Sequence, residues 1–467
     1  MNSKITSKIV DKTLFNLRSV WQQINILSSD HPKLKPDLPD SDIALLKQQM
    51  QDCLQGKGGN VSARARAAKL GEAYLCLNDT GRLRFLTLLA QDFGVDNEQI
   101  RTLASQVLES EAETAGIGKL HQQLRNALRP AGLELLMQFN SLPSGVKFLV
   151  DMRSDLRRLA DRNDQSLKDL DKSLKDLLRS WFDIGFLDLV RLSWATPAAV
   201  LEKLIHYEAV HKIRSWSDLK NRLQTDRRCF AFFHPRMPDE PLIFVQVALV
   251  KSLSDNIQQL LDESVPLEDP FEANTAIFYS ISNAQSGLAG VGFGDFLIKR
   301  VVADLKQELP NIKTFSTLSP IPGLRRWIDK HAEDDLLLAS ERQALRKLAS
   351  FTTLSETLAK VSWHEDADLV AALQKPMMRL TAEYLVNAKQ RNRAVDPVAN
   401  FHLNNGARLE RINWLADTSE KGFRESAGMM VNYLYKLDDI ERNHEIYRDN
   451  AETITVSAIQ SLLKKTK

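Results

Sequence analysis

A glycine-rich loop in the second half of the chain is the first feature suited to chemistry. Residues 287–294 read Gly-Leu-Ala-Gly-Val-Gly-Phe-Gly and lie between a predicted strand (275–282) and a predicted helix (295–309). Such a loop lets backbone N–H groups approach a phosphate, and the helix N-terminus adds a positive dipole end. Asp295 stands where the third glycine of a dinucleotide fingerprint belongs, and no Gly-Lys-Ser/Thr follows. The loop therefore predicts a pyrophosphate site that is neither a dinucleotide-binding fingerprint nor a mononucleotide P-loop. The alternative is a tight turn that binds no ligand.

A histidine and a serine are the other candidates for chemistry. His402 lies in residues 400–406 (Asn-Phe-His-Leu-Asn-Asn-Gly), where the polar end of a helix could direct it into a cleft. Ser319 precedes Pro320, so its ordinary role is an N-cap for a helix over 324–328. No Gly-x-Ser-x-Gly surrounds any serine, which disfavours a hydrolase elbow. No His-Glu-x-x-His or other metal spacing occurs, so we predict no metal site.

The elements that must position these residues change character near residue 185. Before it the apolar spacing is helical, clearest in the seam Leu167, Leu170, Leu174, Leu177 and Trp181. We interpret this seam as packing within a bundle, with a coiled coil as the alternative. After it we predict a hairpin of strands 229–233 and 242–250, strands 275–282, 314–319 and 407–415, and a short helix 395–403 capped by Gly406. The fold class is therefore α+β, with an all-helical N-terminal bundle followed by a mixed α/β domain.

Composition excludes several classes of protein. The 467 residues carry 62 Lys+Arg against 60 Asp+Glu, a formal charge of +2, so the surplus of cations that a nucleic-acid binder needs is absent. Cys53, Cys76 and Cys229 are far apart in the sequence, which favours a reducing compartment. No run of about 18 apolar residues indicates a membrane span, and no secretory or clear transit pattern begins the chain. We expect a cytoplasmic protein with no nucleic-acid or membrane partner.

Four blocks of sequence resemble the malonyl-CoA decarboxylase family, and together they span most of residues 205–435. They are Tyr207-Glu-Ala-Val-His211 with Trp216; 276–282 running through Gly287 and Gly290 to 296–302; Leu318-Ser-Pro-Ile-Pro-Gly323; and 398–407 with Arg411-Ile-Asn-Trp414. The resemblance implies a helical oligomerisation domain over 1–185 and a CoA-binding catalytic domain over 186–467, related to the GCN5-type acetyltransferase (GNAT) fold. It also implies a homo-oligomer, either a dimer or a tetramer.

The resemblance assigns roles to individual residues as well. The family's catalytic pair falls on Ser319 and His402. The substrate-binding positions fall on Ser280, Ala289, Gly290, Val291, Gly292, Phe293, Gly294, Asp295, Ser319, His402 and Tyr435. Members of the family can carry an acidic residue where this chain has Gly292, so no role of that carboxylate transfers. Gly287 likewise replaces the Gln or Arg usual in the acetyltransferase loop.

The implied reaction converts malonyl-CoA to acetyl-CoA and CO2 and fits these residue types. Loss of CO2 leaves a thioester enolate, which needs hydrogen-bond donors at the thioester oxygen and an acid for the α-carbon. We take His402 as the acid and Ser319 as the donor that orients the malonyl carboxylate, while either could deliver the proton. The thioester is the electron sink, so no cofactor is expected. The alternatives are an acyl-CoA N-acyltransferase and a non-catalytic module that binds CoA thioesters and protein partners.

Overall fold

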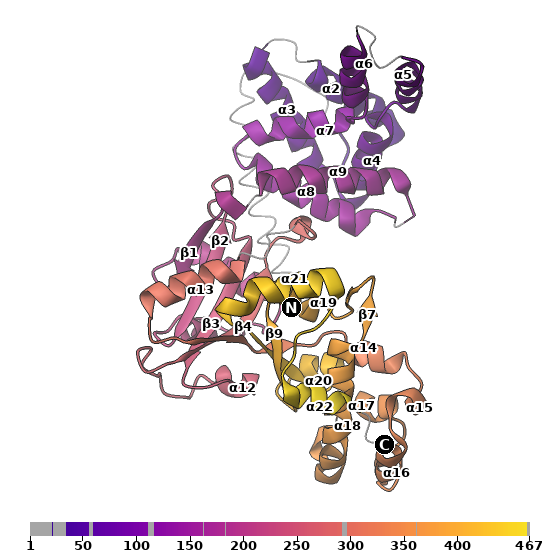
Figure 1. Cartoon of the computed structure of the whole chain (residues 1–467). Coiled ribbons are helices and arrows are strands. Elements are labelled where there is room, and N and C mark those ends of the chain that lie inside the picture. The colour runs from indigo at the N-terminus through magenta and orange to yellow at the C-terminus, as the bar shows by residue number, and fades with distance from the viewer. Residues whose placement is uncertain are drawn as a thin grey trace. The chain divides into compact units, whose positions relative to one another are not determined.

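The computed structural model describes residue 21 and residues 34–55, 59–110, 116–161, 163–182, 184–291, 297–360 and 362–464 (Figure 1). The chain forms two compact units. The first runs to Leu187 and takes in two later segments, His234–Glu240 and Gln285–Gly292. The second holds the rest of the chain from Asp188 onward. Two sequence predictions, the absence of a signal at the N-terminus and the loop positions Gly292 to Asp295, concern residues outside those described.

The first unit is helical, as predicted. Its helices are α2 (Asp40–Leu54), α3 (Gly59–Cys76), α4 (Asp79–Asp92), α5 (Asn97–Glu109), α6 (Ile117–Ala127), α7 (Ala131–Gln138), α8 (Gly145–Leu159) and α9 (Gln165–Trp181). Asp164 caps the N-terminus of α9, and its carboxylate accepts the N–H groups of Ser166 and Leu167. Its leucine seam is buried against neighbouring helices α4 and α8, which confirms the packing interpretation.

The second unit is built on a mixed sheet. Its strands are β1 (Asp188–Leu192), β2 (Arg227–Phe233), β3 (Ile243–Val250), β4 (Thr275–Asn283), β5 (Thr314–Thr317), β6 (Ser319–Pro320), β9 (Arg408–Asn413) and β10 (Met430–Leu434). The order is β1-β2-β3-β4-β5-β10-β6, with β9 also paired to β10. Strands β2 and β3 form the predicted antiparallel hairpin, while β4 and β5 are parallel. Strands β7 (Lys389–Gln390) and β8 (Arg393–Ala394) make a separate ribbon.

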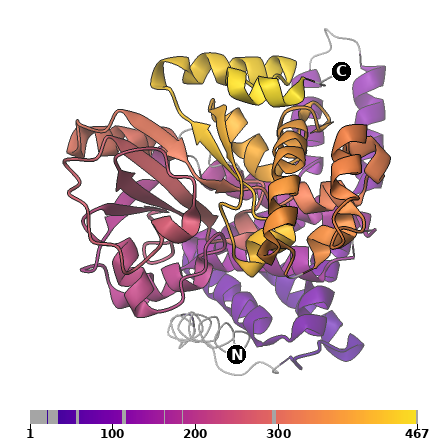
Figure 2. The same ribbon diagram turned by 90° about the horizontal axis from the view of Figure 1, so that it is seen from below.

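The second unit also contains helices, some of which cover the sheet. They are α10 (Ala198–Tyr207), α11 (Trp216–Arg222), α12 (Ile257–Leu260), α13 (Leu297–Glu308), α14 (Leu324–Asp329), α15 (Glu333–Leu336), α16 (Ala339–Leu345), α17 (Leu354–Ala359), α18 (Ala367–Val386), α19 (Pro397–Asn404), α20 (Glu420–Ser426), α21 (Ile440–Asn450) and α22 (Ser457–Leu463). In Figure 2 the orange helices α14 to α18 lie on one side of the gold strands β9 and β10, and the rose strands lie on the other.

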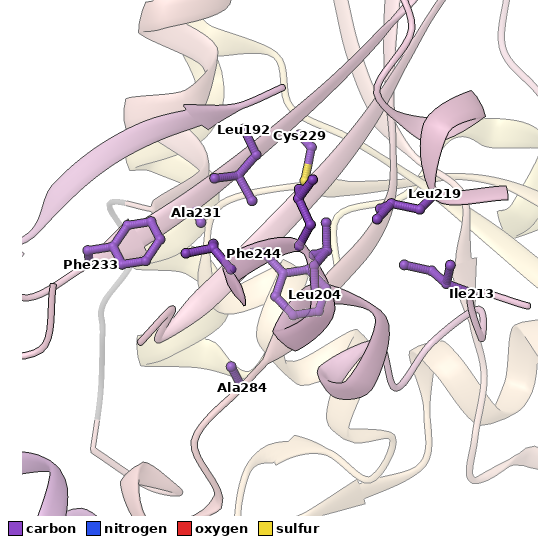
Figure 3. Close-up of a cluster of buried hydrophobic side chains, with 11 residues drawn as sticks. Leu192, Leu204, Ile213, Leu219, Cys229, Ala231, Phe233, Phe244 and Ala284 are labelled. Atoms are coloured by element: carbon purple, nitrogen blue, oxygen red, sulfur yellow. The ribbon is translucent and has the colours of Figure 1, made fainter. Parts of the chain in front are cut away.

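A buried apolar cluster fixes α10 and α11 on the sheet. Side chains from the two helices, including Leu204 and Leu219, pack on Ala231 of β2 and Phe244 of β3 (Figure 3). Each fully buried large apolar side chain stabilises the fold by about 1.5–3 kcal/mol. The cluster therefore holds the C-terminal end of α10 in a defined place, where Glu208 ends the helix.

Candidate active site

A cavity lies where two strands of the sheet separate. Strands β4 and β5 pair in parallel up to Phe278 and Thr317, and beyond this point their ladder stops. A register shift opposite Gln246 and Val247 bends β4, while Ser319 pairs instead with Val431 of β10. The cavity beside this gap has a volume of about 330 Å³, and its lining includes Ser280, Ser319 and His402.

Ser319 lies on strand β6, so its interpretation as a helix N-cap is wrong. The residue is buried and pairs with β10, and the following helix α14 begins instead after Gly323. The serine-proline signal was ambiguous because the partner strand β10 lies more than a hundred residues later in the sequence. Its pairing with β10 aligns Ser319 with the cavity.

His402 is held by a helix with both ends fixed. Asp396 caps the N-terminus of α19, and its carboxylate accepts the N–H groups of Val398 and Ala399. It ends as predicted at Gly406, which has φ +79°, and the N–H groups of Gly406 and Ala407 donate to the carbonyls of Leu403 and His402. The other carboxylate oxygen of Asp396 accepts the N–H of Gly323 at 3.2 Å. One buried carboxylate therefore ties the histidine helix to the turn that follows Ser319.

A hydrogen-bond chain joins Ser319, His402 and Tyr435. The Tyr435 hydroxyl is 2.7 Å from Nδ1 of His402, and Nε2 is 3.1 Å from Oγ of Ser319. The Ser319 hydroxyl donates to Oγ1 of Thr317 at 2.8 Å. Because that proton is engaged, Nε2 carries the imidazole proton and donates to Ser319, while Nδ1 accepts from Tyr435.

Burial keeps this chain neutral. It lowers the pKa of His402 to about 3, so the imidazole is uncharged near neutral pH. Burial also raises the pKa of Tyr435, which therefore keeps its hydroxyl proton. The imidazole stacks on the ring of Tyr433 with centroids 4.7 Å apart and an interplanar angle of 25°. His402 is thus a neutral N–H donor of fixed orientation.

Ser280 faces the same cavity but has another partner. Its hydroxyl donates to the buried carboxylate of Glu208, with oxygen distances of 2.9 and 2.7 Å. Sequence reasoning did not single out Glu208 as the partner of Ser280. One signal was available, because Gln246 interrupts the apolar run of β3 and a polar residue buried in a strand needs a polar partner. Gln246 donates to Glu208 at 2.5 Å.

The described part of the glycine loop, up to Val291, belongs to the helical unit. A Cβ on Gly287 would lie 1.8 Å from the carbonyl oxygen of Val150 on α8, so only glycine fits. Gly290 has φ +74°, a conformation that favours glycine. Arg153 of α8 donates to the carbonyls of Gly287 and Ala289 at 2.6 and 3.0 Å. The structure alone therefore explains why glycine stands at two of the four positions, Gly287 and Gly290, without a bound ligand.

The backbone donors of this loop are partly engaged. The N–H groups of Ala289 and Val291 donate to the carbonyls of Ser286 and Leu288. Gly290 follows the turn closed by the Ala289 N–H, and Gly292, Phe293, Gly294 and Asp295 lie outside the described residues.

Among the residues described, no cluster of His, Cys, Asp and Glu could hold a metal ion. None of the described helices is long and apolar enough to cross a membrane.

Comparison with known proteins gives consistent matches. Residues 93–182 match the malonyl-CoA decarboxylase N-terminal domain, and residues 185–467 match the C-terminal domain. Mitochondrial malonyl-CoA decarboxylase from Anser anser anser is 41% identical over 406 residues, covering 82% of this chain and 80% of the relative. The enzyme of Mus musculus is 40% identical over 402 residues, covering 82% of each.

Solved structures agree with these sequence matches. The crystal structure of malonyl-CoA decarboxylase from Rhodopseudomonas palustris has a TM-score of 0.82 and 42% identity, covering 90% of this chain and 99% of its own. The structure from Agrobacterium vitis has a TM-score of 0.81 and 40% identity, covering 90% and 100%. Matched along both halves in sequence and in fold, the chain belongs to the malonyl-CoA decarboxylase family of carboxy-lyases.

Proposed function

We propose that this chain converts malonyl-CoA to acetyl-CoA and CO2 at the cavity that Ser280, Ser319 and His402 line. The observation that carries the proposal is the buried Ser319–His402–Tyr435 chain at the gap between β4 and β5. It sets a neutral hydrogen-bond donor beside a cavity at the end of two parallel strands. Family membership supplies the substrate.

In the proposed reaction the bond between the α-carbon and the carboxylate carbon breaks, and CO2 leaves. The electron pair moves into the thioester, giving an enolate that hydrogen-bond donors stabilise. One proton then bonds to the α-carbon, so malonyl-CoA and one proton give acetyl-CoA and CO2. The thioester accepts the electrons, and the step requires no biotin, thiamine or pyridoxal group.

His402 is the proposed acid and Ser319 the proposed orienting donor. A neutral imidazole N–H serves as the electrophile in other enzymes that form enolate-type intermediates. As Nε2 gives its proton to the strongly basic carbanion, the Tyr435 hydroxyl can donate more fully to Nδ1. When substrate enters, the Ser319 hydroxyl turns from Thr317 towards the malonyl carboxylate. The Nε2–H of His402 then lies one hydrogen-bond length from the α-carbon that receives the proton.

The CoA moiety is proposed to bind as in a GNAT fold. The antiparallel β1 to β4, the parallel β4–β5 pair that separates, and the neighbouring β10 and β9 support this assignment. In such a fold the pyrophosphate meets the loop after β4, here Ala289 to Asp295. We keep 1–185 as the helical domain and 186–467 as the catalytic domain in this proposal.

Assembly and compartment complete the proposal. Helices α5 and α6 contain no buried side chain, and their exposed faces would suit self-association into a dimer or tetramer. Light scattering on the purified chain tests this, and a monomer at micromolar concentration would refute it.

The three cysteines are free thiols, which suits a cytoplasmic enzyme, although the animal relatives are named mitochondrial. Fractionation of the source cells decides the compartment.

The deciding experiment is mass spectrometry of the thioesters after the purified protein meets malonyl-CoA in D2O, without amine or cofactor. We expect acetyl-CoA with deuterium on its methyl group. Unchanged malonyl-CoA would refute decarboxylation. Malonyl transfer to an added amine would then identify an acyltransferase, and tight binding without turnover would identify a non-catalytic module.

A further inference from the structure

Glu208 has a buried carboxylate, and the sequence analysis gave this residue no role. It ends α10 and receives donors from three directions. The N–H groups of Val210 and His211 donate to Oε1 at 2.8 and 2.9 Å, and the amide of Gln246 donates to Oε2 at 2.5 Å. Ser280 donates at 2.7 Å. In each of these hydrogen bonds the Glu208 carboxylate is the acceptor, and several donors that converge on one carboxylate stabilise it.

The neighbours of Glu208 fix the direction of each hydrogen bond. The Tyr279 hydroxyl donates to Oε1 of Gln246 at 3.0 Å, and Arg222 approaches the same oxygen at 3.4 Å. This orients the Gln246 amide so that its nitrogen faces Glu208. Ser282 also directs its hydroxyl to the carboxylate, at 3.3 Å. The Ser280 Oγ also lies 3.2 Å from Oγ of Ser282, where either hydroxyl could donate. Because the shorter contacts of Ser280, at 2.7 and 2.9 Å, are to the carboxylate, we assign its single proton to Glu208.

We propose that Glu208 is a positioning residue that makes Ser280 a pure hydrogen-bond acceptor towards the substrate cavity. The malonyl carboxylate and the thioester carbonyl are themselves acceptors, so they gain nothing from the Ser280 oxygen. The donors that a CoA thioester offers near its reacting end are the amide N–H groups of the pantetheine arm. Ser280 shares its cavity with Ser319 and His402, so it accepts the amide N–H nearest the sulfur.

This inference rests on the proposed decarboxylation and makes it more specific. It assigns Ser280 to recognition of the CoA arm and leaves the malonyl group to Ser319 and His402. Replacing Glu208 by Gln would place an NH2 group against Ser280 and reverse its hydrogen bond. The serine would then present a proton to the cavity, and the substrate N–H would meet a donor.

The test compares two small substrates that differ at one position. One is the malonyl thioester of N-acetylcysteamine, and the other replaces its amide N–H by an ester oxygen. We expect wild-type protein to favour the amide by about 10-fold in kcat/KM, within the range of one hydrogen bond to a well-oriented acceptor. In Glu208→Gln and Ser280→Ala the ratio should fall below about threefold, while Glu208→Asp should retain part of it.

A matched control separates recognition from folding. Glu341→Gln alters a carboxylate on α16 that pairs with Arg379 at 2.6 Å and does not line the cavity. It should keep the wild-type ratio. Because Ser280→Ala leaves Glu208 in place, it tests the inference even if Glu208→Gln fails to fold. An unchanged ratio in Ser280→Ala overturns the inference, whereas no turnover of malonyl-CoA by wild-type protein refutes the proposed function itself.

Discussion

At the scale of single residues, the Ser319–His402 pair makes the clearest prediction. His402→Ala and Ser319→Ala should each lower kcat by roughly 100-fold or more, because each removes a donor needed at the enolate or the carboxylate. The double variant should be little worse than the single ones, since the two side chains act through one hydrogen bond. Steady-state kinetics with malonyl-CoA measures this, and circular dichroism checks the fold. A near-wild-type rate for either variant would remove that residue from the mechanism.

The low pKa of His402 sets the pH dependence. Its folded pKa is about 3 and its unfolded reference about 6.5, so between these values only the unfolded chain binds the proton. The free energy of unfolding should therefore fall as pH drops from about 6.5 towards 3. The parameter kcat/KM reports the free enzyme, and it should show no histidine inflection between about pH 5 and 8. An inflection near 6.5 that disappears in Tyr435→Phe would contradict a neutral resting imidazole.

The residues of the site differ in how far sequence could reveal them. The helix that carries His402 could be predicted from local sequence, because Gly406 ends it and two amides make that end polar, whereas the catalytic role of His402 came only from the family resemblance. The position of Ser319 on a strand depends on pairing with the distant strand β10, so local sequence suggested a helix N-cap that the structure does not contain. Glu208 could not be found by spacing, since its donors come from the loop after α10, from β3 and from β4. Convergence across distant elements leaves no periodic signal.

At the scale of elements, two neighbouring glycines should behave differently. Gly287→Ala places a methyl group 1.8 Å from the Val150 carbonyl and should destabilise the protein by about 2 kcal/mol or more. Gly290→Ala meets nothing closer than Lys175 at 3.5 Å, so its cost is the positive φ alone, about 1 kcal/mol. Thermal unfolding of the two variants compares them. Equal midpoints would contradict the close approach of the loop to α8.

The elements that sequence predicted are those whose pattern is local. The hairpin of β2 and β3 and the leucine seam of α9 are confirmed within a few residues. Strands β1 and β10 were missed. Three of the five β1 positions are exposed because it is an edge strand. Strand β10 carries Asn432 in a buried position, where its amide donates to the Thr317 carbonyl. Neither strand shows simple alternation or a continuous apolar run.

At the scale of the whole molecule, the two compact units do not coincide with the two halves of the sequence. His234–Glu240 and Gln285–Gly292 come from the second half yet group with the helical unit. The imidazole of His234 is 3.0 Å from the Trp181 carbonyl, and buried Arg153 donates to two loop carbonyls. The described part of the loop proposed to hold the CoA pyrophosphate therefore contacts helix α8, from the N-terminal half of the sequence.

This interdependence predicts the outcome of dividing the chain at residue 186. Residues 186–467 expressed alone should unfold at a lower temperature than the full chain and bind malonyl-CoA more weakly, because loop 285–291 lacks Arg153 and the surface of α8. Residues 1–185 co-expressed with 186–467 should restore part of both properties, since the helices can again hold the loop. Calorimetry and equilibrium binding to each preparation provide the comparison. If the isolated second half matched the full chain in both measurements, the helical unit would have no part in forming the CoA site.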